Sequence, residues 1–200
     1  MREKDVLRMF KESGALLSGH FLLSSGLHSD QYLQAALVLQ WPSKALALAG
    51  ELAKRFHGER VSVIIGPAVG GITFAFAVAQ NFDGCRALFA ERENGIFSLR
   101  RGYALEEKDR VLVVEDVITT GGSTREVIQL AGSFKAEVVG VGAIAERSAE
   151  PVDFNVRKEV LLRLPLKTFT PDLCPLCRQS VPLVKPGSRK PGTRAEQRPL

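Results

Sequence analysis

Two adjacent carboxylates precede a loop of small polar residues in the segment VLVVEDVITTGGST, residues 111–124. Four apolar residues, typical of a buried strand, run directly into Glu115 and Asp116. The loop that follows places consecutive backbone N–H groups at the start of a predicted helix, where glycines leave the backbone accessible. The hydroxyls of the loop's threonines and serine supply further hydrogen-bond donors. Such a loop suits a phosphate group.

The two acids require a ligand of a different kind. Glu115 and Asp116 repel a phosphate, because all three groups are anionic. Carboxylates suit sugar hydroxyls, a developing positive charge or the water shell of Mg²⁺. The segment therefore predicts a bound sugar phosphate, with its phosphate in the loop and its hydroxyls on the carboxylates. The alternative is a surface turn with an N-capping residue and two solvated acids, but the complete unit of strand, acid pair, loop and helix favours binding.

A second glycine-rich turn, GPAVGG at residues 66–71, follows another apolar run, VSVII at residues 61–65. Neither turn matches the dinucleotide-binding pattern G-x-G-x-x-G, and neither contains the G-K-[ST] of a nucleoside triphosphate loop. In open α/β sheets, ligands bind outside the carboxyl ends of the strands. Both turns are therefore candidates for the binding site.

The elements that carry these turns alternate between strand and helix. Apolar runs predict strands over residues 61–65, 86–91, 110–115 and 137–146. Helical spacing and flanking Pro or Gly predict helices over residues 41–58, 72–80 and 124–134. This order predicts an α/β fold, with a parallel twisted sheet flanked by helices.

Composition places the chain among ordinary globular domains. Its 200 residues are 45% hydrophobic and 24% charged, and they carry a net charge of +5. Residues 185–200 hold five basic side chains and one acid, a balance of +4, which leaves +1 for residues 1–184. We expect this tail to be a disordered, solvated terminus rather than a polyanion-binding arm. No membrane span or signal peptide is evident, so the expected compartment is the cytoplasm.

The segment at residues 111–124 resembles the phosphoribosyl pyrophosphate (PRPP) signature of the type I phosphoribosyltransferases. Four further segments resemble the branch of that family that acts on orotate: GHFLLSSGLHSDQYLQ, VSVIIGPAVGGI, ALFAERE and AIAERS. The resemblance implies the type I phosphoribosyltransferase fold, with a small hood built from N- and C-terminal segments. It implies transfer of the phosphoribosyl group of PRPP to orotate, giving orotidine 5′-monophosphate and pyrophosphate in pyrimidine biosynthesis. It also implies Mg²⁺ and a homodimer with shared active sites.

The resemblance also implies roles for individual residues. It implies catalytic roles for Glu115, Asp116 and Arg92. PRPP would be bound by Arg92, Glu115, Asp116, Val117, Ile118, Thr119, Thr120, Gly121, Gly122 and Ser123. The pyrophosphate loop would contain Val69 and Gly70, and orotate would contact Thr119, Arg147, Tyr32 and Leu33. No direct protein ligand to Mg²⁺ is implied; the ion would arrive with the substrate and lie near the two acids.

This sequence departs from the family in its basic residues. The family commonly has lysine where Gly70 stands, and Arg100 and Arg101 are candidates to replace basic residues usual in its mobile loop. We expect residues 92–108 to form a lid that closes over the reaction; the alternative is a solvated hairpin.

Resemblance and composition together predict one phosphoribosyltransferase domain at residues 1–184. Its core would span about residues 40–150, and its hood about residues 14–36 and 150–184.

Three cysteines, an odd number, argue against a disulfide framework. Cys174 and Cys177, in CPLC, have the spacing of a metal knuckle but supply only half of a tetrahedral site. A partner subunit, Cys85, or one of the three histidines, His20, His28 and His57, could complete it. Plain packing or redox-silent thiols are the preferred interpretation, and a structural role is preferred for His20 and His28.

Two other functions remain open from the sequence alone. A type I phosphoribosyltransferase for another base would share the PRPP loop and differ around Tyr32 and Arg147. A regulator with the same fold and PRPP pocket could bind nucleic acid through the basic tail, but the charge of +1 over residues 1–184 offers it little support.

Overall fold

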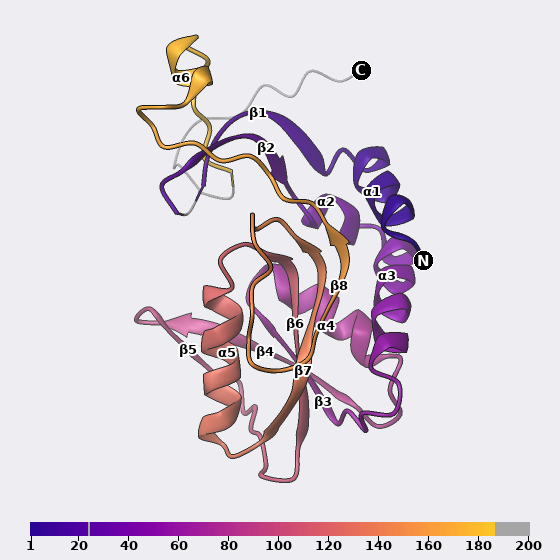
Figure 1. The fold of residues 1–200 in the computed structure, drawn as a ribbon. Coiled ribbons are helices and arrows are strands. Elements are labelled where there is room, and N and C mark those ends of the chain that lie inside the picture. The colour runs from indigo at the N-terminus through magenta and orange to yellow at the C-terminus, as the bar shows by residue number, and fades with distance from the viewer. Residues whose placement is uncertain (24, 187–200) are drawn as a thin grey trace. The chain divides into compact units, whose positions relative to one another are not determined.

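The computed structural model describes residues 1–23 and 25–186 (Figure 1). The chain divides into two compact units. The larger comprises Met1–Leu17 and Leu33–Leu166, and the smaller comprises Ser18–Tyr32 and Lys167–Leu200. The tail predicted to be disordered lies, beyond residue 186, outside the described residues. Within the described part of the chain, no helix is long and apolar enough to cross a membrane.

A six-stranded sheet organises the larger unit, with strand order β5-β4-β3-β6-β7-β8. Its strands are β3 (Val63–Pro67), β4 (Arg86–Glu93), β5 (Ile96–Ser98), β6 (Arg110–Ile118), β7 (Glu137–Glu146) and β8 (Lys158–Arg163). Neighbouring strands are parallel, except that β5 runs antiparallel to β4. The four predicted strands and the parallel α/β class are confirmed, and β5 and β8 are additions to them.

Helices cover both faces of this sheet (Figure 1). They are α1 (Glu3–Glu12), α2 (Ala36–Leu39), α3 (Pro42–Arg55), α4 (Gly70–Ala79) and α5 (Gly122–Ser133). Alternation along β3 sends Val63 and Ile65 into the apolar cluster beneath α5. Ile64 joins the opposite cluster, beneath α3 and α4. The sheet is thus buried on both sides, as its apolar strands predict.

Strand β6 extends further than its apolar run predicts. The predicted end was residue 115, but pairing with β7 continues to Ile118, opposite Glu146. Pairing with β3 ends earlier, at Val113 opposite Ile65. The last residues of β6 are therefore hydrogen-bonded as a strand on the β7 side only, and the β3 side is open to the loop between β3 and α4.

The smaller unit contains most of the paired strands β1 (Leu16–Leu22) and β2 (His28–Leu33), together with α6 (Pro175–Arg178). Leu16 and Leu17 of β1 and Leu33 of β2 belong to the larger unit. Isolated bridges join this hairpin to the C-terminal segment, from Phe21 to Val184 and from His28 to Phe169. The expectation that N- and C-terminal segments combine into a small additional structure is confirmed.

Candidate active site

The carboxyl ends of β3, β6 and β7 lie side by side at one edge of the sheet, because these strands are adjacent and parallel. The β3–α4 turn, the β6–α5 loop and the residues after β7 all leave from this edge. The backbone N–H of Arg147 donates to the carbonyl of Ile118 at 3.0 Å. The fold thus gathers three of the four predicted segments that belong to the larger unit.

The β6–α5 loop depends on one glycine. Gly121 is the N-cap of α5 and has a left-handed backbone with φ of 77°, which an L side chain rarely adopts. A Cβ at this position would also lie 2.7 Å from Val152 Cγ1 and 2.9 Å from the Phe154 ring. The loop conformation therefore requires glycine for its backbone and for its packing.

The N-terminus of α5 offers free donors. The first N–H groups of a helix have no partner within the helix, and among the described residues no side chain caps α5. These groups and the positive end of the helix dipole favour an anion. The predicted phosphate position, around Gly121, Gly122 and Ser123, coincides with this helix N-terminus, and phosphate binding there stays a prediction.

Arg125 stabilises the β6–α5 loop through hydrogen bonds to backbone carbonyls, a role that the sequence did not reveal. Its guanidinium donates to the carbonyls of Thr120 and Asp153, each at 2.9 Å, and lies over the Phe154 ring. One partner is 28 residues away, in the segment between β7 and β8, and no local pattern marks that contact.

The two acids point to different neighbours, since side chains alternate along a strand. Glu115 accepts a long hydrogen bond, 3.4 Å, from the hydroxyl of Thr124 in the first turn of α5. Thr124 is buried, so its hydroxyl serves the acid rather than a phosphate. Asp116 lies against Gly70 at the start of α4, where an added Cβ would come within 2.4 Å of Oδ2. Glycine at position 70 leaves room for that carboxylate.

Both carboxylates lie in surroundings that disfavour their ionised form. Burial, and then the negative charge of Asp116, raise the pKa of Glu115 well above its ordinary value. Burial also raises the pKa of Asp116, although the N–H of Val117 opposes this by donating to it at 2.8 Å. The described basic side chains Arg86, Arg92 and Lys158 form ion pairs with other carboxylates. An electropositive ligand would lower the cost of ionising both carboxylates.

The β3–α4 turn is tight and partly exposed. Gly66 and Gly71 pack so closely that an added Cβ on Gly66 would lie 2.4 Å from the Gly71 carbonyl oxygen. Val69 is 82% exposed, and its peptide bond with Ala68 is cis. A pocket of about 200 Å³ beside this turn is lined by Ala36, Leu39, Gln40, Val69, Gly70 and Thr73. The predicted pyrophosphate residues, Val69 and Gly70, therefore border open space.

Arg92 lies at the end of β4, in a short hairpin with β5. Its guanidinium forms two 2.8 Å hydrogen bonds with the carboxylate of Glu126 in α5, and it stacks on Phe97. Arg101 is paired with Glu91 at 2.9 Å. The segment predicted to be a lid thus begins as a hairpin, and its arginines hold carboxylates in this conformation. The proposed contacts with pyrophosphate remain predictions.

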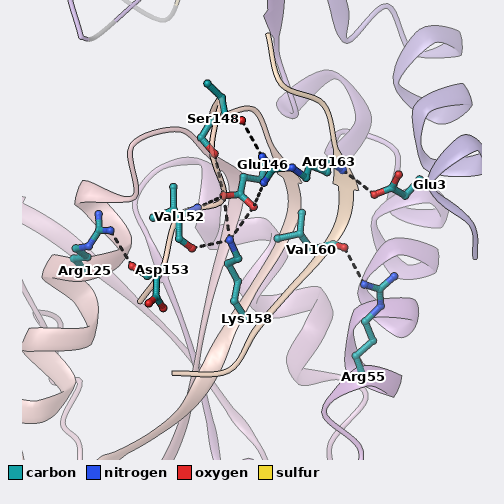
Figure 2. A network of polar contacts seen from close by, with 11 residues as sticks. Glu3, Arg55, Arg125, Glu146, Ser148, Val152, Asp153, Lys158, Val160 and Arg163 are labelled. Atoms are coloured by element: carbon teal, nitrogen blue, oxygen red, sulfur yellow. Dashed lines mark hydrogen bonds and ion pairs between the residues drawn. The ribbon is translucent and has the colours of Figure 1, made fainter. Parts of the chain in front are cut away.

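Arg147 follows a strand end that is fixed by a buried ionic network. Glu146 is only 2% exposed. It accepts hydrogen bonds from the Lys158 ammonium at 2.9 Å and from the backbone N–H of Val152 at 2.6 Å, and it lies 3.4 Å from the Arg163 guanidinium (Figure 2). Burial alone would raise the pKa of Glu146, but these hydrogen bonds and charges outweigh it and lower the pKa. Glu146 is therefore a structural anchor beside Arg147.

Comparison with known proteins identifies the family. The phosphoribosyl transferase domain matches residues 38–160. The chain is 50% identical over 190 residues to orotate phosphoribosyltransferase of Caldicellulosiruptor bescii, which covers 95% of this chain and 100% of that protein. It is 51% identical over 190 residues to orotate phosphoribosyltransferase of Caldanaerobacter subterraneus. That alignment also covers 95% of this chain and 100% of the relative. The chain belongs to the orotate phosphoribosyltransferase family.

The fold agrees with membership of the orotate phosphoribosyltransferase family. A crystal structure of orotate phosphoribosyltransferase from Aeropyrum pernix superimposes with a TM-score of 0.67 at 27% identity. The match covers 80% of this chain and 93% of that one. The type I phosphoribosyltransferase fold, expected from a few quoted segments, is confirmed.

The two remaining orotate positions belong to different units. Tyr32 is in the smaller unit, where its ring lies 5.8 Å from that of Phe21. Leu33 is in the larger unit, and its side chain is 3% exposed. Their predicted role is a backbone one, which a buried leucine side chain does not oppose.

The family implies Mg²⁺, and the donor set fits this ion. Glu115 and Asp116 supply hard carboxylate oxygens of the kind that Mg²⁺ prefers. Burial raises both pKa values, as does the charge of Asp116 for Glu115, and a cation would oppose this rise. The pair would hold the ion through its water shell or through substrate hydroxyls, near the ribose.

Proposed function

We propose that this chain transfers the phosphoribosyl group of PRPP to orotate, giving orotidine 5′-monophosphate and pyrophosphate. The curated relatives at about 50% identity carry the name of that activity. One observation carries the proposal: the acids Glu115 and Asp116, whose pKa values are raised by burial, are near the end of the strand that leads through a short loop to α5, where no side chain of the described residues caps the helix N-terminus. This arrangement matches a ribose 5-phosphate in charge and in polarity.

The 5-phosphate binds the loop between β6 and α5. The N–H groups at the start of α5 donate hydrogen bonds to the phosphoryl oxygens, and Thr119, Thr120 and Ser123 add hydroxyl donors. Arg125 donates a hydrogen bond to the carbonyl oxygen of Thr120. This bond keeps the carbonyl oxygen directed away from the phosphate. The loop therefore binds an anion with donors fixed before the substrate arrives.

Glu115 and Asp116 bind the ribose and stabilise its transition state. Loss of pyrophosphate from C1 builds positive charge on the sugar, and buried carboxylates stabilise that charge more strongly than they stabilise the neutral sugar. The substrate would thereby offset part of the cost of ionising both acids. The acids act by electrostatics and positioning, without a covalent intermediate.

The β3–α4 turn and Arg92 bind the leaving pyrophosphate. The guanidinium can engage two phosphate oxygens at once, and to do so Arg92 exchanges Glu126 for the substrate. Arg100 and Arg101 are further candidates on the same segment. Mg²⁺, when bound with PRPP, supplies additional charge neutralisation on the diphosphate. Closure of residues 92–108 would exclude water, which otherwise hydrolyses PRPP.

Orotate is held by its carboxylate and its ring. Arg147 binds the carboxylate, Thr119 contacts the base, and the backbone at Tyr32 and Leu33 cradles the ring. Orotate is already an anion, so its ring nitrogen requires little assistance from a general base. The working enzyme is a homodimer in which each active site includes loop residues of the partner subunit.

Pyrophosphate release tests the proposal directly. The purified protein is incubated with PRPP, Mg²⁺ and, in turn, orotate, uracil, adenine, guanine and hypoxanthine. We expect turnover with orotate alone. Turnover with a purine or with uracil would assign another base, and PRPP binding without any turnover would indicate a regulator.

A kinetic split tests the assignment of Arg147. The variant Arg147→Ala should raise the KM for orotate by roughly 10-fold or more, because a charge-assisted pair with the substrate carboxylate is lost. The KM for PRPP should change little. Equal increases in both constants would contradict carboxylate recognition by Arg147.

A further inference from the structure

The smaller unit contains a compact group of four metal-binding side chains: His20, His28, Cys174 and Cys177. His20 is in β1 and His28 begins β2, while both cysteines belong to the CPLC segment at α6. Their ligand atoms all lie within 4.8 Å of one another. Residues far apart in the chain thus converge on one point in the smaller unit.

The distances approach those of a tetrahedral zinc site. His20 Nε2 lies 2.9 Å from His28 Nδ1 and 3.4 Å from Cys174 Sγ, and Cys177 Sγ lies 3.3 Å from His28 Nδ1. Bond lengths to zinc imply separations of about 3.3–3.8 Å between ligand atoms at the corners of a tetrahedron. Small shifts would open the cluster around an ion.

The hydrogen bonding of His20 orients it as a ligand. Its Nδ1 lies 2.8 Å from the carbonyl oxygen of Val181. A carbonyl only accepts, so Nδ1 carries the proton, and the lone pair of Nε2 faces His28 and the two cysteines. This outer hydrogen bond is the arrangement that fixes the tautomer of zinc-bound histidines.

Burial supports an ion rather than simple packing. His20 is 2% exposed, His28 is 5% exposed and Cys174 is fully buried. The described residues of this unit belong to neither of the two large apolar clusters of the protein. A small unit without a sizeable apolar core usually requires a disulfide or a metal, and its cysteines are free thiols.

We propose that His20, His28, Cys174 and Cys177 bind one Zn²⁺ ion that fastens the C-terminal segment to the β1–β2 hairpin. Two thiolates balance the charge of the ion, and two neutral imidazoles complete its preferred tetrahedral set. Four protein ligands leave no open position, so the site is structural and takes no part in the transfer reaction. The inference is independent of the proposed function, because every residue involved lies outside the β6–α5 loop.

Histidine was expected to supply one completing ligand at most, and plain packing of the cysteines was preferred. The structure instead places two histidines beside both cysteines. Cys85 and His57, the other candidates, belong to the larger unit and are not part of this group.

Metal analysis of the purified full-length protein tests the site. We expect about one zinc per chain, as for a closed structural site, and visible ligand-field bands of tetrahedral thiolate coordination after replacement by Co²⁺. Cys177→Ser and His28→Ala should lose the zinc and these bands. The matched controls, Cys85→Ser and His57→Ala, should keep both. Zinc contents equal in all four variants would overturn the proposal.

Because the ligand variants can fail to fold, the unmodified protein provides a second test. Removal of zinc by a chelator should raise amide hydrogen exchange in residues 18–32 and 167–186, and added Zn²⁺, but not Mg²⁺, should restore protection. Absence of zinc from protein supplied with it, or thiols that react only after reduction, would overturn the site. The second result would indicate a Cys174–Cys177 disulfide instead.

Discussion

At the scale of single residues, the proposed function rests on side chains whose environment opposes their preferred charge state. Glu115 has a raised pKa because it is buried beside Asp116. A pair of acids is stable in such a place only when one is protonated or a positive group is near. The substrate that fits is one that brings hydroxyls and develops positive charge.

The variant Glu115→Gln separates stability from activity. The raised pKa means that Glu115 favours folding when protonated, and that this contribution is lost as pH rises through the folded-state pKa. Glutamine is neutral at every pH, so the unfolding free energy of the variant should fall less than that of the unmodified protein as pH rises above the unfolded pKa, about 4.3, and through the folded-state pKa. Its kcat should fall by roughly 100-fold or more. Chemical denaturation across pH and steady-state kinetics measure both effects, with the exposed Glu107→Gln as control. Parallel pH curves for the two variants would contradict the burial argument.

Two glycines in the same region form a matched pair. Gly121→Ala places a methyl group on a left-handed residue and against Val152 and Phe154, so it should cost about 2 kcal/mol of unfolding free energy or more. It should also weaken PRPP binding severely. Gly132→Ala, in α5 with no atom within 4 Å of the added Cβ, should be neutral or stabilise by up to about 1 kcal/mol. Thermal unfolding and calorimetric titration with PRPP distinguish them; similar losses in both variants would contradict a special conformation at Gly121.

The candidate site could be proposed from the sequence where its chemistry is local. The acid pair and the loop lie within ten residues and follow an apolar strand, so their partnership with a phosphorylated sugar could be predicted. The hydrogen bonds of Arg125 with Asp153, and of Thr124 with Glu115, depend on how separate segments pack, and the sequence did not mark them.

At the scale of elements, the hairpin of β4 and β5 carries a residue with two competing partners. Arg92 is hydrogen-bonded to Glu126, and the proposed reaction requires it at the pyrophosphate. Both side chains are more than 40% exposed, so solvent screens the pair and its worth to stability is below about 1 kcal/mol.

Removing each partner in turn distinguishes the two roles. Arg92→Ala and Glu126→Ala abolish the same ion pair and should have similar, small effects on stability. Only Arg92→Ala should lower kcat, by roughly 10-fold or more, because it removes charge from the leaving group's site. Rapid kinetics with PRPP and orotate would measure this. Equal losses of kcat in both variants would mean that the ion pair, and not the free guanidinium, supports catalysis.

Strands β7 and β8 are joined by the network around Glu146 (Figure 2). Its lowered pKa implies a contribution to stability that is present above the unfolded pKa, about 4.3, and is lost as pH falls through the folded-state pKa. Lys158→Met removes the nearest cation and should cost roughly 1–3 kcal/mol at neutral pH, since Arg163 remains. Acid unfolding of the variant should begin at higher pH. The exposed Lys108→Met is the control, and identical acid transitions in the two variants would contradict the anchoring role.

The sequence was less informative about elements that lack an apolar pattern. The segment that becomes β8, KEVLLR, is short and has three charged residues, and β5 has only three residues in all. Both are strands because a neighbour supplies their hydrogen bonds. Likewise, β6 continues past its apolar run because β7 pairs with it to Ile118.

At the scale of the whole molecule, the proposed shared active sites predict complementation between inactive chains. If Arg92 acts on the partner's site, a mixed dimer of Glu115→Gln and Arg92→Ala chains contains one site with neither change. Random mixing of equal amounts should then restore activity to about a quarter of the unmodified level. Activity assays after co-refolding measure this, with each variant alone as control. No restoration, with mixed dimers present, would place Arg92 in the site of its own chain.

The smaller unit contains a group of side chains that no local sequence pattern could predict in full. CPLC predicted half of a metal site, but 154 residues separate Cys174 from His20. Only the folding of the C-terminal segment onto the β1–β2 hairpin brings the other half to it.

The proposed function requires a ribose 5-phosphate to bind where β6 ends and α5 begins. A crystal structure of the protein with ribose 5-phosphate tests it most directly. We expect the phosphate to accept hydrogen bonds from the N–H groups of Gly121, Gly122 and Ser123, and the sugar hydroxyls to contact Glu115 and Asp116. A phosphate bound elsewhere, with this loop free of ligand, would contradict it.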